Sequence, residues 1–170
     1  NKTYRLALMG VLTALLFMGQ VIMAVLPNIE IISLLVILYT VFFFFLVFWM
    51  IYCFVFLECF LYGFGMWFFN YLYVWTILAL VCLPFRKNTS VTFWSIISGF
   101  FGLGFGTLCT LPYLITGGPT AAFSYWVSGL GFDITHCIGN VILCLVYVGQ
   151  LNHVSPLGIL IQMPHKRTAY

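Results

Sequence analysis

The sequence predicts an all-α integral membrane protein: a bundle of six transmembrane helices with both termini in the cytoplasm. Of its 170 residues, 64% are hydrophobic and 5% are charged, and the mean hydropathy is +1.16. Such a chain lacks the polar surface that a soluble domain needs. The apolar runs also lack the alternation of β-barrel strands. Because backbone facing lipid must satisfy its hydrogen bonds internally, we expect every span to be a helix.

A third observation, the placement of the basic residues, predicts the topology. All six fall in three pairs along the chain: Lys2 and Arg5, Arg86 and Lys87, and Lys166 and Arg167. Lys and Arg are enriched at the cytoplasmic flanks of transmembrane helices. The pattern therefore predicts that all three pairs lie on the cytoplasmic side, with an even number of spans between successive pairs.

The first span is expected at residues 4–26, ending before Pro27 and Asn28. Apolar sequence continues beyond it, and no small-residue cleavage site precedes a soluble body. This segment is therefore interpreted as a membrane span and not as a cleaved signal.

The next apolar run extends to about Tyr62, which is longer than one span needs. An even number of spans before Arg86 requires two helices here, at 31–45 and 48–63. We therefore predict a tight turn near Phe44 to Val47, although this run contains no Gly, Pro or charge.

The second half of the chain contains clearer turn signals. The region of Gly63, Gly65 and Asn70 is expected to be an exterior loop, "PFRKNTS" an interior loop, and "TGGPT" a turn. These signals bound the fourth, fifth and sixth spans, predicted at 71–84, 91–115 and 121–147. The six spans form one membrane domain, residues 1–148, and residues 149–170 form a cytoplasmic or interfacial tail.

Three acidic residues lie on the outer side of the predicted bundle: Glu30, Glu58 and Asp133. An ionisable side chain within the hydrocarbon layer costs at least about 2.5 kcal/mol, so it usually faces the bundle interior and often marks a ligand or ion path. The three acids suggest an outward-facing polar cavity. For Glu30 the alternative is a charge at a helix N-terminus that satisfies free backbone N–H groups.

Five residues of the sixth span recur at spacings of three and four: Trp126, Gly129, Asp133, His136 and Asn140. This spacing places them on one helix face, where the indole could stack on a planar ligand and the polar groups could bind it. The alternative is that Asp133 and His136 pair with each other or with neighbouring helices and hold the bundle together.

Small residues form a second pattern. Ala7, Gly10 and Ala14 lie on one face of the first span, and small residues at such spacing allow close approach of another helix. Both a partner membrane protein and packing within the chain could use this face. For the glycines of "SGFFGLGFGT" in the fifth span, packing within the monomer is favoured.

Several kinds of chemistry are not supported by the sequence. It contains no phosphate-binding Gly loop ending in Lys-Ser or Lys-Thr, so we expect no ATP hydrolysis by this chain alone. Its six cysteines form no CxxC pair and fall within spans, which is typical of small apolar core residues. We expect no metal site, no resident cofactor and no nucleic-acid partner.

Three segments together resemble the substrate-binding S component of energy-coupling factor vitamin transporters. They are "RLALMGVLTALLFMG", "LPNIEIISLLVILYTVFF" and "YWVSGLGFDITHCIGNVIL", and the likeness extends over roughly residues 4–147. In that family the turn between the second and third helices usually carries Gly and basic residues, whereas this chain has "FFFFLVF".

The resemblance implies a multi-pass protein of the prokaryotic plasma membrane that captures a vitamin or related micronutrient from outside. It implies partners, a transmembrane T component and two ABC ATPases, and it maps the docking surface onto Ala7, Gly10 and Ala14. It also implies a pocket built from the loop after the first helix and from helices four to six. The candidate pocket residues are Asn28, Glu30, Asn70, Tyr71, Trp75, Tyr113, Trp126, Asp133, His136 and Asn140.

The candidate pocket is rich in aromatic residues and poor in charge, which favours a ring-bearing, mostly neutral ligand. Cobalamin is the first candidate, while folate, pantothenate, pyridoxine-like and queuosine-like ligands stay open. Two other classes also stay open. A small intramembrane enzyme or redox protein would use Asp133 and His136 to handle protons, and a bound cofactor would colour it. A structural subunit of a membrane complex would bind no ligand.

Overall fold

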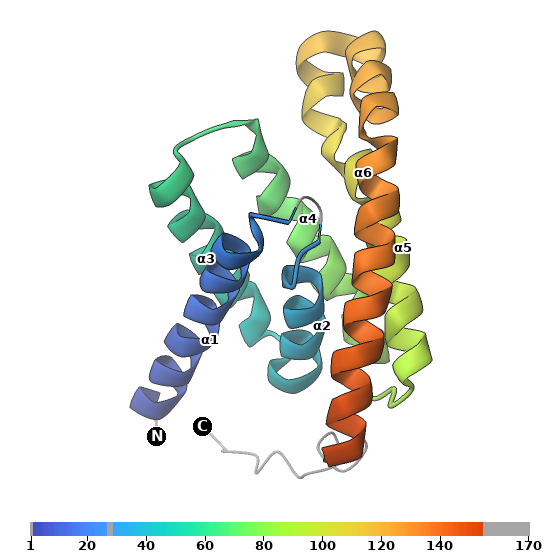
Figure 1. The fold of residues 1–170 in the computed structure, drawn as a ribbon. Coiled ribbons are helices and arrows are strands. Elements are labelled where there is room, and N and C mark those ends of the chain that lie inside the picture. The colour runs from blue at the N-terminus through green and yellow to red at the C-terminus, as the bar shows by residue number, and fades with distance from the viewer. Residues whose placement is uncertain (1, 27–28, 155–170) are drawn as a thin grey trace.

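A computed structural model describes residues 2–26 and 29–154, and within these ranges all of the secondary structure is helical (Figure 1). The elements in chain order are α1 (Lys2–Met23), α2 (Ile32–Phe43), α3 (Leu46–Tyr62), α4 (Met66–Cys82), the 3-10 helix η1 (Leu83–Phe85), α5 (Val91–Cys109) and α6 (Leu111–Val154). Successive helices run up and down, so the start of α1 and the end of α6 lie at the same end of the bundle. The predicted all-helical class is confirmed.

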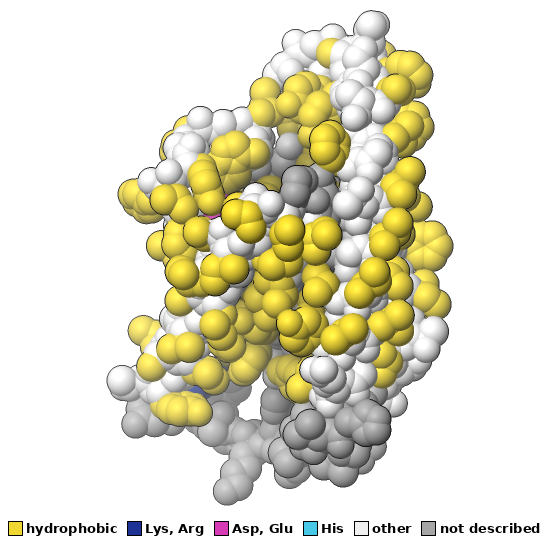
Figure 2. Space-filling view, in the orientation of Figure 1, with side chains coloured by type: hydrophobic (Ala, Val, Ile, Leu, Met, Phe, Trp, Pro, Cys, Tyr) yellow, Lys and Arg dark blue, Asp and Glu magenta, His cyan; other side chains and the backbone are white. Residues whose placement is uncertain are grey.

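The helices have the length and composition of a membrane protein. Among the described residues, four stretches are apolar and long enough to cross a bilayer: Lys2–Met23, Met66–Phe85, Val91–Cys109 and Leu111–Leu151. The space-filling view shows hydrophobic side chains over most of the visible face (Figure 2). Helices α2 and α3 are apolar but shorter. The count of six spans therefore stays a prediction.

The short helix α2 lies at the centre of the bundle and contacts every other α-helix. Its buried residues point in all directions around the helix: Ile32, Ser33, Leu34, Val36, Ile37, Tyr39, Thr40 and Val41. Its polar groups find partners inside the bundle. The Thr40 hydroxyl donates to the Val36 carbonyl at 2.7 Å, and the Tyr39 hydroxyl donates to the Leu12 carbonyl of α1 at 3.1 Å. A helix of 12 residues is about 18 Å long, well short of the roughly 30 Å hydrocarbon core of a bilayer.

The turn between α2 and α3 consists of two phenylalanines. Phe44 has φ 55° and ψ −125°, close to the first central residue of a type II′ turn, a position that favours glycine. The guanidinium carbon of Arg86 lies 4.6 Å from the centre of the Phe44 ring. A cation over an aromatic face is stabilising. Arg86, from the loop between α4 and α5, thus packs against this turn from outside it.

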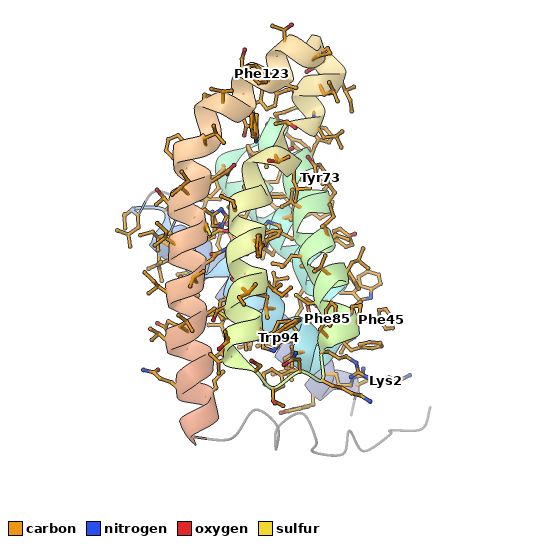
Figure 3. All side chains as sticks on the ribbon, turned by 90° about the vertical axis from the view of Figure 1, so that its right-hand side faces the viewer. Lys2, Phe45, Tyr73, Phe85, Trp94 and Phe123 are labelled. Atoms are coloured by element: carbon orange, nitrogen blue, oxygen red, sulfur yellow. The ribbon has the colours of Figure 1, made fainter. Side chains whose placement is uncertain are left out.

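The basic residues of the described chain gather at one end of the bundle. In Figure 3, Lys2, Phe45 and Phe85 lie toward this end, and Phe123 lies at the opposite one. Arg86 and Lys87 follow Phe85 directly, at the start of the loop before α5. The first two basic pairs therefore share one end, while the third pair lies outside the described residues. Which side of the membrane this end faces stays a prediction.

Two helix boundaries differ from the expected ones. Helix α4 begins at Met66, so Asn70 is not in a loop but is buried in the helix, where its Oδ1 accepts from the Tyr73 hydroxyl at 2.9 Å. The chain turns earlier than expected because Gly63 adopts φ 75° and Gly65 is extended, which completes the break within three residues.

The other difference concerns α5 and α6. Helix α5 ends at Cys109, not at residue 115, and Leu111 already starts α6. Within α6, however, two helical parts meet at a kink at Gly118, with φ 74°, immediately before Pro119, so "TGGPT" breaks the helix as predicted. Beyond it α6 continues through the predicted boundary at residue 147 to Val154.

Glycines bring α5 and α6 into direct backbone contact. A Cβ atom on Gly99 would lie 2.6 Å from the Val141 side chain, and one on Gly102 would lie 2.9 Å from the backbone of Cys137. Gly106 similarly faces the carboxylate of Asp133, whereas Gly104 has open space around it. Three of the four glycines therefore serve packing within the monomer.

Candidate ligand-binding site

A cavity of about 300 Å³ lies between the end of α1, the segment that follows it, and helices α4, α5 and α6. Its lining residues are Gln20, Met23, Ala24, Leu26, Ile29, Glu30, Tyr71, Phe105 and His136. The upper end of α2 lies well below the upper end of α6 (Figure 1). Because α2 is so short, Ile29 and Glu30, which precede it, lie within the height of the bundle and line the cavity.

The carboxylate of Glu30 and the imidazole of His136 meet in this cavity. The His136 Nε2 atom lies 2.8 Å from Glu30 Oε1, which also accepts a hydrogen bond from the Ser33 hydroxyl at 3.2 Å. The His136 side chain is 5% exposed, and its Nε2 makes no well-directed hydrogen bond among the described residues. The pair is therefore in ion-pair contact whenever the imidazole is protonated, and a ligand group placed between them could replace this contact.

Two aromatic side chains and one amide line the cavity beside this pair. Phe105 meets the His136 ring edge to face, with ring centres 4.9 Å apart. The Gln20 amide nitrogen lies 3.5 Å from the Tyr71 hydroxyl, at the long limit of a hydrogen bond. The Gln20 carbonyl oxygen is buried and has no partner within the described chain. An unpaired buried acceptor is costly, so this oxygen is available to a ligand donor.

Two other polar residues of the predicted α6 face bind α5 and do not line the cavity. Asp133 Oδ1 accepts from the Gly106 backbone N–H at 2.9 Å, and the Asn140 amide donates to the Ser98 carbonyl at 3.0 Å. Both side chains are buried, and each leaves one oxygen, Asp133 Oδ2 and Asn140 Oδ1, without a partner in the part of the chain described. Their observed contacts are those of the interhelical alternative.

The remaining predicted site residues lie outside the cavity lining. Trp126 is 36% exposed and donates from its indole nitrogen to the Thr107 hydroxyl at 3.0 Å. Tyr113 stacks on Tyr125 with ring centres 4.1 Å apart, and Trp75 is completely buried in the core. Asn70 bonds to Tyr73 as described above, and Asn28 lies outside the described residues.

The structure thus brings together Glu30, Tyr71 and His136 from the predicted set. Sequence reasoning missed Gln20 and Phe105, along with the four apolar lining residues Met23, Ala24, Leu26 and Ile29. Gln20 carried a usable signal, because an amide inside an otherwise apolar span needs a polar partner. Phe105 carried none, since the chain contains 19 phenylalanines.

Glu58 is the one acidic residue of the described chain for which no partner is found. It is 2% exposed, and its Oε1 atom accepts no hydrogen bond within the described ranges. It lies near the end of α3 and is absent from the cavity lining. It is therefore a second buried carboxylate that does not line the cavity but lies near enough to Tyr71 to act on it electrostatically.

No protein-family model, no curated protein and no solved structure matches this chain. The described chain is all-helical, with apolar helices of membrane-spanning length. A small pocket between these helices contains one carboxylate and one imidazole.

Proposed function

We propose that this chain is the substrate-binding S component of an energy-coupling factor transporter. In this role it captures a vitamin or related micronutrient from outside the cell. It then delivers the ligand for uptake with a transmembrane T component and two ABC ATPases, which hydrolyse the ATP. The chain itself is a binding subunit and not an enzyme.

The observation that carries the proposal is the composition of the cavity. The family resemblance implies a pocket made by the loop after the first helix and by helices four to six. The cavity is lined by the end of α1 and the segment after it, by Tyr71 of α4, by Phe105 of α5 and by His136 of α6. A pocket between helices, mostly apolar with a few converging polar groups, is typical of small-molecule sites.

The exposed face of α1 supports the partner assignment. Only Thr13 and Leu16 of this helix are fully buried, so most of its surface is free for lipid or for another protein. Ala7, Gly10 and Ala14 are exposed, and the position of Gly10 has open space around it. Small residues let a second helix approach closely, which suits docking on a T component.

A binding screen tests the proposal. The full chain, purified in detergent, is titrated calorimetrically with cobalamin, folate, pantothenate, thiamine, pyridoxine and related compounds. We expect one of them to bind tightly, and cells that also express a T component and both ATPases to accumulate that compound. Absence of binding across the panel, or binding without ATP-dependent uptake, contradicts the proposal.

A further inference from the structure

The chemistry of the cavity wall restricts the charge of its ligand. Among the described residues that line it, the charged or titratable side chains are Glu30, His136 and Tyr71, and the other polar side chain is that of Gln20. No Lys or Arg is among these described lining residues, and the described basic residues gather at one end of the bundle, on Lys2, Arg5, Arg86 and Lys87. A buried carboxylate needs a positive partner or several donors, whereas an anion beside it would leave two like charges in a site of low polarity.

Two oxygen acceptors of the described wall can take further donors, while the His136 Nε2 atom lies against one of them. The Gln20 carbonyl oxygen has no donor within the described chain, and Glu30 Oε1 receives only the Ser33 hydroxyl and the His136 contact. A ligand that carries N–H groups or a positive nitrogen satisfies both oxygens at once. Hydrogen bonds to a charged group are stronger than neutral ones, so Glu30 makes the larger contribution.

The apolar part of the wall favours a flat ring. Phe105 and Tyr71 both line the cavity, and Phe105 already contacts the His136 ring at 4.9 Å. Aromatic faces attract cations as well as other rings. A ring that carries positive charge or a protonated amino group therefore uses the aromatic walls and the carboxylate together.

The volume sets an upper limit on size. A cavity of about 300 Å³ lies at the small end of ligand sites, which extend from about 300 to 1,000 Å³. A compound of one or two rings fits such a space. A corrinoid macrocycle with its nucleotide tail is several times larger than such a compound and does not fit.

We propose that the site selects a small organic cation built on one or two nitrogen-containing rings, held by Glu30 and Gln20 and stacked against Phe105 or Tyr71. This assignment rests on the proposed function, because it names the class of micronutrient that the same cavity takes. It favours cationic compounds over anionic vitamins and over cobalamin.

A matched set of probes isolates charge from size. Pyridoxamine, pyridoxine and 4-pyridoxic acid share one ring and differ in carrying an ammonium, a hydroxyl or a carboxylate. Thiamine adds a two-ring cation, and pantothenate, folate and cobalamin complete the panel. Calorimetric titration of the purified full chain near neutral pH is expected to rank a cation first, with pyridoxamine at least about tenfold tighter than 4-pyridoxic acid.

Glu30→Gln keeps the shape of the side chain and removes its charge. It should weaken binding of the tightest cation by about 10- to 100-fold. Glu58→Gln makes the same chemical change at a buried carboxylate that does not line the cavity, and it should weaken that affinity clearly less than Glu30→Gln does. Thermal unfolding of both variants reports whether they fold.

The outcomes separate the two proposals. If an anion, a neutral compound or cobalamin binds tightest, or if Glu30→Gln leaves cation affinity unchanged, the charge assignment is wrong while the transporter assignment stands. If a cation binds through Glu30 but is never taken up with the partner subunits, the charge assignment stands and the transporter function fails. If nothing in the panel binds, both fail.

Discussion

Gly102 of α5 packs directly on the backbone of His136 in α6: a Cβ atom at position 102 would lie 2.9 Å from the His136 carbonyl carbon. Helix backbones approach this closely only where a side chain is missing. The residue that presents its imidazole to Glu30 is therefore held in place by the absence of a methyl group on the neighbouring helix.

Gly102→Ala should destabilise the protein by about 1 to 3 kcal/mol, because the added methyl group meets backbone atoms that cannot rotate away. Gly104→Ala, two residues along the same helix, has open space around it and should be neutral or stabilising by up to about 1 kcal/mol. Unfolding followed by circular dichroism in detergent compares the two. Equal stability of both variants would show that α5 and α6 are not packed as described.

The contact between Glu30 and His136 should be measurable as a coupling. In a double-mutant cycle with Glu30→Ala and His136→Ala, we expect an interaction free energy of about 0.5 to 3 kcal/mol in the stability of the ligand-free protein. A second cycle, which combines Glu58→Ala with His136→Ala, provides the comparison, because no hydrogen bond or ion pair is found between these two described residues. That second cycle should be additive within about 0.5 kcal/mol.

Asp133 and Asn140 should act on stability more than on ligand affinity. Asp133→Ala and Asn140→Ala each remove a hydrogen bond to the α5 backbone and should cost about 1 to 3 kcal/mol of unfolding free energy. His136→Ala, in contrast, should weaken binding by roughly 5- to 150-fold. Ile138→Ala is the control on the exposed face of α6, where 55% of the side chain is accessible. A stable Asp133→Ala variant with lost binding would assign Asp133 to the pocket after all.

Substitutions on the exposed face of α1 should separate transport from binding. Gly10→Leu fills open space and changes no described contact, so ligand affinity of the isolated subunit should stay the same. Uptake with the partner subunits should fall at least about tenfold, because a bulky side chain prevents close helix contact. Gly131→Leu provides an equally exposed site on α6 and should retain uptake. Joint loss of binding and uptake in Gly10→Leu would mean that the face packs internally.

Cysteine labelling tests the predicted orientation. On a cysteine-free background, Phe64→Cys places a thiol at a 75% exposed position between α3 and α4, which is predicted to face outside. Lys87→Cys places one at the basic end of the bundle. An impermeant maleimide added to intact cells should modify position 64 and spare position 87. The reverse pattern would invert the topology.

Features that depend on composition and local turn chemistry could be predicted from the sequence. The all-helical class follows from apolar content, and the break at Gly118 from a Gly-Gly-Pro run. The turn between α2 and α3, expected near Phe44 to Val47, lies at Phe44 and Phe45 in the structure. The even number of spans between basic pairs predicts this turn, whereas no Gly or Pro in the run marks it.

The geometry of the site could be predicted only in part. Glu30 and His136 are 106 residues apart in the sequence, and their meeting depends on how α6 is rotated against α5 and α2. That rotation is determined by the glycines of α5, which turn Asp133 and Asn140 toward α5 and leave His136 to the cavity. A spacing of three and four places residues on one face but does not say which neighbour that face meets.

The central position of α2 has a consequence for the lipid environment. Helices that face lipid adapt to a thicker or thinner bilayer by tilting, and this hydrophobic mismatch changes their packing. Helix α2 is surrounded by the other α-helices, and Glu30 precedes it directly. The contact between Glu30 and His136 should therefore vary little with the acyl chain length of the surrounding lipids, whereas Gln20 lies on the exposed α1 and should shift as that helix tilts.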